Sequence, residues 1–160
     1  DSFKTGRSAF AALRDRKRFD ELYELYQLAF MCLSTDDLES MIGRGLSLLR
    51  TFTKATVVGF LSTDDFGALK PYYIEPPDGA QRLKLSQKLT DVVVRQATAV
   101  WTKHELRNSR DDGALRQFAD AICIPLIEDK RAYGVIHLYR DTEQFQTPHF
   151  DFAISAGNIM

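Results

Sequence analysis

The sequence has little cysteine, no surplus of one charge and no long apolar run, and each shortage excludes a class of protein. Both of its cysteines, Cys32 and Cys123, lie inside apolar segments, so we expect buried free thiols in a reducing, cytoplasmic setting. The formal net charge is −1 over 160 residues, which gives no electrostatic reason to expect a nucleic-acid or membrane partner. No apolar run approaches the roughly 18 residues that a transmembrane helix needs.

The sequence also lacks the short motifs that mark catalytic and metal sites. It contains no glycine-rich phosphate loop and no Gly-x-Ser-x-Gly turn, and its three histidines define no triad with the scattered carboxylates. The separation of Cys123 and His137 matches no metal-ligand pattern. We therefore predict a domain that is neither an enzyme nor a metal-binding protein.

Regular apolar spacing predicts helices at both ends of the chain. Between Phe19 and Leu33, apolar residues recur at three- and four-residue intervals, as they do along one face of an amphipathic helix. The last helix is expected to begin with Thr147 as its N-cap. The other helices predicted from the same spacing cover residues 38–52 and 86–97.

The two ends of the chain indicate a segment of a larger protein. It begins with Asp1 rather than Met, and it ends at Met160 while a helical pattern is still running. The mixed, basic residues 1–18 are interpreted as a linker or as an N-terminal extension of the first helix. Residues 19–160 are then one domain.

Runs of β-branched and apolar residues between the helices predict an antiparallel sheet. Two such runs, 121–127 and 133–139, flank a charged turn and predict a hairpin. The second run is apolar on both faces, as expected of a central strand that is covered on two sides. Further strands are predicted over 56–62, 68–74 and 99–101. Hairpins with helices at both ends favour an α+β fold with an antiparallel sheet of five to six strands.

Particular residues in these elements resemble a GAF domain. The segment Ile122-Cys-Ile-Pro-Leu-Ile127 is similar to the family strand that ends in "VPL", and Tyr133-Gly-Val-Ile-His-Leu138 is similar to its "GVLxL" strand. Phe145 with the segment from Asp151 to Met160 is similar to the family's "F…D…LA.QI" helix. The sequences of these segments are most like those of GAF domains that accompany fork-head-associated or other signalling domains in bacterial regulators.

The resemblance implies a GAF-like, PAS-related fold with the terminal helices on one face of the sheet and a small-molecule pocket on the other. It implies a regulatory domain of a bacterial transcription regulator, cyclase or kinase, which binds an unidentified small molecule, controls an attached output domain and forms a homodimer through its terminal helices. It names no cofactor. Sulfoxide reductases built on this fold need several placed cysteines, and two are too few.

Two alternatives stay open beside this sensor. One is a ligand-free scaffold that dimerises through the first and last helices, favoured by the leftover apolar residues Phe10, Leu13, Tyr23 and Leu28. The other is a redox sensor that acts through Cys123.

Strand alternation selects the residues expected to line the pocket. If Ile136 and Leu138 pack on the helices, the alternate residues of that strand face the other way. His137 then either contacts a ligand or is a half-buried histidine satisfied by neighbouring groups, and Trp101 either walls the site or packs as a core or edge aromatic. The full set of pocket candidates is Phe60, Tyr72, Trp101, His104, Cys123, Val135, His137 and Tyr139.

Overall fold

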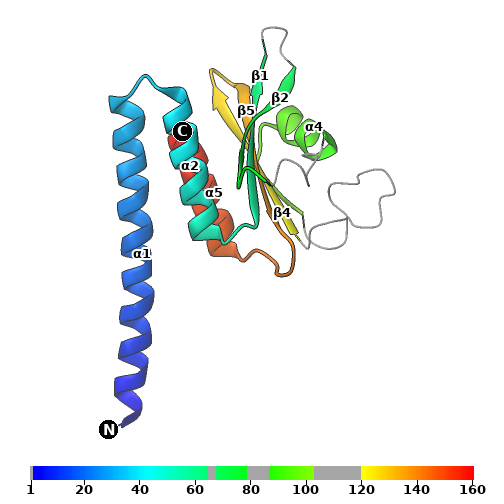
Figure 1. Cartoon of the computed structure of the whole chain (residues 1–160). Helices are drawn as coiled ribbons and strands as arrows, with labels where there is room; N and C mark the ends of the chain where they lie inside the picture. The colour runs from blue at the N-terminus through cyan, green and yellow to red at the C-terminus, as the bar shows by residue number, and fades with distance from the viewer. Residues whose placement is uncertain (1, 65–67, 79–86, 103–119) are drawn as a thin grey trace.

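The computed structural model describes residues 2–64, 68–78, 87–102 and 120–160, with side chains from residue 16 onward. These residues form an open antiparallel sheet with helices on both faces (Figure 1). The strands lie in the spatial order β2-β1-β5-β4-β3, and each neighbouring pair is antiparallel. The predicted α+β class is therefore confirmed. The strands are β1 (Val57–Thr63), β2 (Leu69–Glu75), β3 (Val100–Thr102), β4 (Asp120–Glu128) and β5 (Arg131–Arg140).

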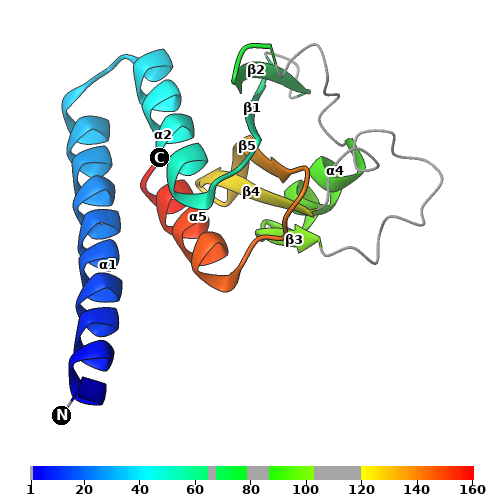
Figure 2. The same cartoon turned by 60° about the horizontal axis from the view of Figure 1, so that its bottom comes forward.

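The helices form layers on the two faces of the sheet (Figures 1 and 2). Helices α2 (Leu38–Thr53) and α5 (Thr147–Ile159) lie against one face, and α1 (Ser2–Ser34) lies outside them. Helix α4 (Gln87–Gln96) covers part of the opposite face. The N-terminal half of α1 projects past the other helices, and residues 2–18 continue it without a break (Figure 1). Within the described residues, no helix is both long and apolar enough to cross a bilayer.

Local side-chain contacts explain where the helices begin. Asp37 is the N-cap of α2, and its carboxylate accepts hydrogen bonds from the backbone N–H groups of Glu39 and Ser40. The N-cap of α5 is Gln146, one residue earlier than predicted. Its backbone N–H donates to Nδ1 of His149, the third residue of the helix, at 3.1 Å, which is the half of a capping box that the N3 side chain supplies.

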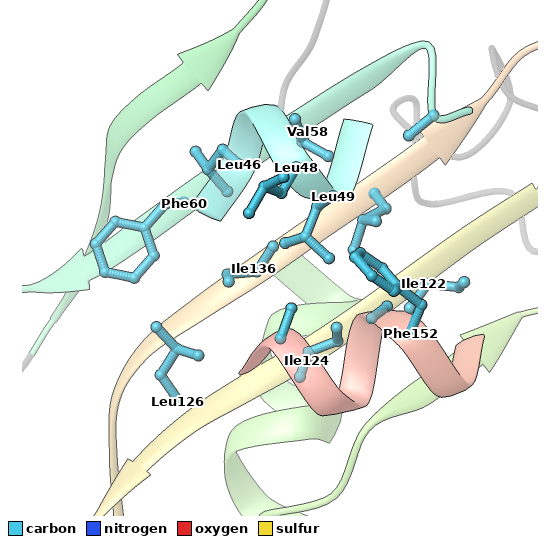
Figure 3. Packing of buried hydrophobic residues seen from close by; sticks show 14 of the residues in the cluster. Leu46, Leu48, Leu49, Val58, Phe60, Ile122, Ile124, Leu126, Ile136 and Phe152 are labelled. Atoms are coloured by element: carbon cyan, nitrogen blue, oxygen red, sulfur yellow. The ribbon is translucent and has the colours of Figure 1, made fainter. Parts of the chain in front are cut away.

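The main hydrophobic core lies between the sheet and helices α2 and α5 (Figure 3). Each large side chain that is fully buried contributes about 1.5–3 kcal/mol to the free energy of folding, so this layer holds the terminal helices on the sheet. The residues labelled in Figure 3 that form it are Leu46, Leu48, Leu49, Val58, Phe60, Ile122, Ile124, Leu126, Ile136 and Phe152.

A second, smaller core lies on the α4 face of the same sheet. Leu89 and Val93 of α4 pack there against side chains from the strands. Strand β5 consequently carries buried residues on both faces, as its sequence predicts. The strand residues of this second core are Val57, Ala121, Cys123, Val135 and Tyr139.

The carboxylate of Asp120 joins three separate parts of the chain. Its Oδ2 accepts from Nε1 of Trp101 in β3 at 2.9 Å and from the backbone N–H of Phe145, before α5, at 2.8 Å. Its Oδ1 accepts from the N–H of Ala121 at 3.0 Å. Charge-assisted hydrogen bonds of this kind are about twice as strong as neutral ones, so this residue fixes the sheet edge relative to α5.

The close approach of Gly134 to β1 leads to a prediction about stability. A Cβ atom at this position would overlap the ring of Phe60 and approach the backbone oxygen of Leu61 to 3.1 Å. We expect Gly134→Ala to lower the free energy of unfolding by about 1–3 kcal/mol through overpacking, measured by urea denaturation. At Gly43 the nearest contact of a Cβ is Tyr73 Oη at 3.7 Å. Gly43→Ala should therefore be neutral or stabilising, and equal stability of the two variants would contradict the packing described here.

Candidate functional site

A buried polar cluster lies on the α4 face, at the centre of the sheet. His137 of β5 is fully buried, and its ring lies between the sheet and α4. Its Nε2 is 2.9 Å from Oγ1 of Thr90 in α4 and 3.5 Å from Sγ of Cys123 in β4. Its Nδ1 is 3.0 Å from Oη of Tyr139. The cluster therefore joins α4, β4 and β5 through one imidazole.

Strand geometry brings these side chains together. Residues two apart on a strand face the same side, so His137 and Tyr139 share a face, and their rings stack at 5.8 Å with an interplanar angle of 23°. Cys123 is the register partner of His137 on the adjacent strand, so it also faces α4. Thr90 completes the cluster from above, between the apolar residues that hold α4 on the sheet.

The cluster is uncharged at neutral pH. Burial lowers the pKa of His137 to about 3, so the imidazole is neutral. A neutral imidazole has one donor and one acceptor nitrogen, so one of the two hydroxyls, of Thr90 or of Tyr139, donates to the ring and the other accepts from it. Burial raises the pKa of the Cys123 thiol well above its usual range, which keeps it protonated.

This arrangement suits recognition better than catalysis. A protonated, fully buried thiol is a poor nucleophile, and it lacks the exposed thiolate that redox sensors use. The neutral groups can exchange hydrogen bonds with a polar ligand inside an apolar surrounding. Within the described ranges, no group of three or more His, Cys, Asp or Glu side chains is placed to hold a metal ion.

Of the pocket candidates, the structure brings Cys123, Val135, His137 and Tyr139 together on the α4 face. Tyr72 of β2 is half exposed, and its ring packs edge-on against Phe60 at 6.0 Å. His104 lies outside the described residues.

Two candidates lie on the opposite face from His137. Phe60 is the register partner of Ile136, so it joins the core beneath α2 and α5. Trp101 is the partner of Ile122, and its ring packs at 5.7 Å from Phe150 of α5. Of the two roles that the sequence leaves open for Trp101, the structure therefore gives it that of an aromatic in this core.

Thr90 is a member of the cluster that is not predicted from the sequence. It lies between Leu89 and Val93, on the apolar side of the helix predicted over residues 86–97, and a threonine at such a position is the signal that could have found it. The structural alternative for His137 is a half-buried histidine satisfied by neighbouring groups, and the side chain is in fact fully buried.

A groove of 690 Å³ offers a second place for a ligand, on the α5 side of the sheet. It runs between the C-terminal end of α5 and β4, past Pro125, Tyr133 and Asn158. The Tyr133 hydroxyl donates to the backbone oxygen of Met160 at 2.8 Å. None of the described residues that line the groove is a fully buried ionisable group like His137, so the groove gives a weaker chemical indication of a binding site.

No family model matches this sequence, and no curated protein is significantly similar to it. Solved structures do share its fold. The GAF domain of a phosphoenolpyruvate-protein phosphotransferase from Acinetobacter has a TM-score of 0.69 and 14% identity, and the match covers 86% of this chain and 88% of that one. The GAF domain of a putative sensor histidine kinase from Pseudomonas syringae pv. tomato has a TM-score of 0.65 and 11% identity, and the match covers 93% of this chain and 88% of that one.

A third similar structure is an enzyme, the free methionine-R-sulfoxide reductase from Neisseria meningitidis, with a TM-score of 0.67, 16% identity and 84% and 82% of the two chains covered. Identities this low establish a common fold and nothing finer. The chain therefore has the fold of GAF domains, as the sequence resemblance predicts. Pairing with a fork-head-associated domain stays a prediction.

The burial of His137 predicts a loss of stability in mild acid. The pKa of His137 is about 3 in the folded protein and near 6.5 in the unfolded chain. Below about pH 6.5 the unfolded chain therefore binds a proton at this residue, whereas the folded protein does not. Stability is then complete above the unfolded pKa and falls as the pH drops towards the folded one. We expect urea denaturation to show a loss of about 2 kcal/mol between about pH 7 and about pH 5.

Two variants test whether His137 causes this pH dependence of stability. His137→Gln keeps a polar side chain that does not titrate, so most of the loss between about pH 7 and about pH 5 should disappear. Burial also lowers the pKa of His149, so His149→Gln is the matched control and should keep most of it. The same loss in the wild type and in His137→Gln would contradict the assignment, whatever the absolute stability of either protein.

Proposed function

We propose that this chain is a regulatory, sensory domain of a bacterial cytoplasmic signalling protein, which binds a small polar molecule beside His137 and controls an attached output domain. The observation that carries the proposal is the neutral cluster of Thr90, Cys123, His137 and Tyr139, enclosed by apolar side chains beneath α4. A few polar groups converging inside an apolar enclosure are the usual composition of a small-molecule site.

The ligand chemistry follows from the state of these groups. No side chain of the cluster carries a charge at neutral pH, so an amide, hydroxyl or heterocyclic nitrogen suits it better than a carboxylate or an ammonium group. Such a group would replace Thr90 as the partner of His137 Nε2. Because Thr90 belongs to α4, binding would move this helix, and the ligand must prefer the moved state to shift the equilibrium.

Sensing rather than catalysis is proposed because the only sulfur in the cluster is a buried, protonated thiol. The similar structures also support regulation, since two of them are domains of a phosphotransferase and of a putative sensor kinase. The reductase among them acts on its own substrate, and this likeness of fold carries no activity to the present chain.

A ligand-free dimerisation scaffold is the second candidate function. It is favoured by the apolar residues that α1 exposes, such as Tyr26 and Phe30. The hydrogen bonds that Thr90, His137 and Tyr139 make to one another also allow the α4 face to remain closed.

A thermal-shift screen against nucleosides, amino acids, amides and aromatic metabolites separates the two candidates. A ligand at about 100 times its dissociation constant adds about 2.7 kcal/mol to the stability of the folded state, so a true hit raises Tm clearly. Trp101, the one tryptophan, packs against α5 on the far face of the sheet. A change in its fluorescence on binding would therefore report that the effect reaches the terminal helices.

Thr90→Val removes the hydroxyl that the ligand would displace from His137, without changing the shape of the side chain, so it should strengthen a hit at this site by about tenfold, which equals about 1.4 kcal/mol. Thr51→Val, which changes an exposed threonine of α2, is the control and should leave affinity unchanged. A hit that both variants bind equally well lies elsewhere and contradicts the proposed site. No hit from a protein that dimerises would favour the scaffold.

A further inference from the structure

Helix α1 exposes a continuous row of large apolar side chains, called here the α1 stripe. Its members are 54% to 90% exposed, whereas Leu28 on the opposite side of the helix is 1% exposed and belongs to the main core. The sequence predicts Leu28 to be available for dimerisation, but it packs in the core of its own domain. Contiguous exposed apolar patches of this kind mark interaction surfaces. The stripe consists of Phe19, Leu22, Tyr23, Tyr26, Phe30 and Leu33.

The α1 stripe is self-complementary about its central residue. Together with the half-buried Ala29, its positions are separated by 3, 1, 3, 3, 1 and 3 residues, so the spacing is the same in both directions from Tyr26. If two copies cross at Tyr26 in antiparallel directions, Phe19 lies opposite the partner's Leu33 and Leu22 opposite the partner's Phe30. A parallel pair would also match apolar positions, because the pattern repeats every seven residues. The spacing therefore identifies a second helix of the same kind, and the charges decide its direction.

Charge is distributed unevenly along the helix. Arg16, Lys17 and Arg18 are exposed and directly precede the stripe. From Phe19 to Gly43 the chain has six carboxylates and no Lys or Arg, with Asp36 in the connection between α1 and α2. A parallel pair would set like charges side by side at both ends of the stripe, which is unfavourable.

The antiparallel pair instead sets opposite charges together. At about 100° per residue, Arg16 and Arg18 flank the stripe about 80° to either side of Tyr26. With the crossing at Tyr26, position 16 lies opposite the partner's position 36, and position 18 lies opposite the partner's position 34. The basic flank of each copy then meets the acidic α1–α2 connection of the other, and this contact occurs twice. The acidic side chains of this connection are Asp36 and Asp37, and Glu39 follows in the first turn of α2.

We propose that the α1 stripe binds the α1 stripe of a second copy of this chain, antiparallel and crossing near Tyr26. This inference rests on the dimerisation proposed above for the scaffold and gives it a direction. The N-terminal ends of the two α1 helices then point away from each other, and the α1 helices hold the two copies together. The two α1 helices therefore do not form a parallel pair.

Sedimentation or light scattering on the whole chain tests the surface. We expect the wild type to be a dimer and Tyr26→Arg to weaken dimerisation at least tenfold, because it places a charge at the centre of the stripe. Tyr72→Arg is the matched control, since Tyr72 is a similarly exposed tyrosine on β2 and should leave the dimer intact. Equal dimerisation of the two variants would overturn the assigned surface.

Charge exchange tests the direction. Reversing the basic flank with Arg16→Glu and Arg18→Glu should weaken an antiparallel dimer several-fold, and adding Asp36→Lys and Glu39→Lys should restore it. In a parallel dimer each of these residues lies beside the same residue of the partner. Reversing the basic flank alone would then replace one like-charge pair with another and leave affinity nearly unchanged, and the two lysine substitutions would restore no affinity. That result would overturn the antiparallel direction.

Distances between spin labels give an independent reading. Lys17→Cys is labelled in a Cys32→Ser background, where the remaining thiol, Cys123, is buried. At about 100° per residue, position 17 lies nine residues from Tyr26 and on the opposite side of the helix, so the labels point away from the pair in either direction. Parallel labels are then separated only across the pair, by the 8–10 Å spacing of packed helices plus the widths of the helices and the reach of the labels. Antiparallel labels are in addition about 27 Å apart along the helix axes and give clearly longer distances. Short distances overturn the direction only. A monomer overturns the dimer and the scaffold function together, while a ligand-induced thermal shift would still support the sensor.

Discussion

Strand β5 is buried on both faces, and the other elements are arranged to meet that constraint. Ile136 and Leu138 need helices α2 and α5 on one face, and Val135 and Tyr139 need α4 on the other. If either layer were missing, each large side chain in its row would lose about 1.5–3 kcal/mol of burial. His137 lies in the row that α4 covers, so its ring must find partners inside the protein. Thr90 and Tyr139 supply them, which is why the polar cluster exists where it does.

The same constraint places the candidate site and the terminal helices on opposite sides of a single strand. A shift of α4 would act on β5, whose other face holds α2 and α5, and α1 packs outside these two helices (Figure 2). Asp120 adds a polar connection, because one carboxylate holds both Trp101 and the backbone at Phe145, just before α5. A continuous path of contacts permits coupling between sites without proving it, so regulation still requires a ligand that distinguishes two positions of α4.

The sequence predicts the parts of this structure that depend on local pattern. The hairpin of β4 and β5 and the division of β5 into two rows follow from alternation, which identifies Val135, His137 and Tyr139 as neighbours. The face of Phe60 depends on its pairing with Ile136, and no local pattern records the register between strands that are distant in the sequence. The bulge after Phe60 in its pairing with β2 obscures the alternation further. The position of Trp101 beside α5 depends in the same way on its pairing with Ile122.

Helix α1 shows why a strong sequence pattern need not describe a protein's own core. The regular spacing from Phe19 to Leu33 predicts the helix correctly, but most of those side chains face away from the domain. On the side of α1 that faces the domain, Leu25 and Leu28 pack against the core. Apolar residues are less regularly spaced on this side because α1 crosses two short helices, α2 and α5, and contacts each over a limited length. A seven-residue repeat is instead what one long helix requires of another that runs alongside it. The clearest periodicity in the first helix is therefore the one that the proposed partner helix would contact, and the charges on its flanks would restrict that partner's direction.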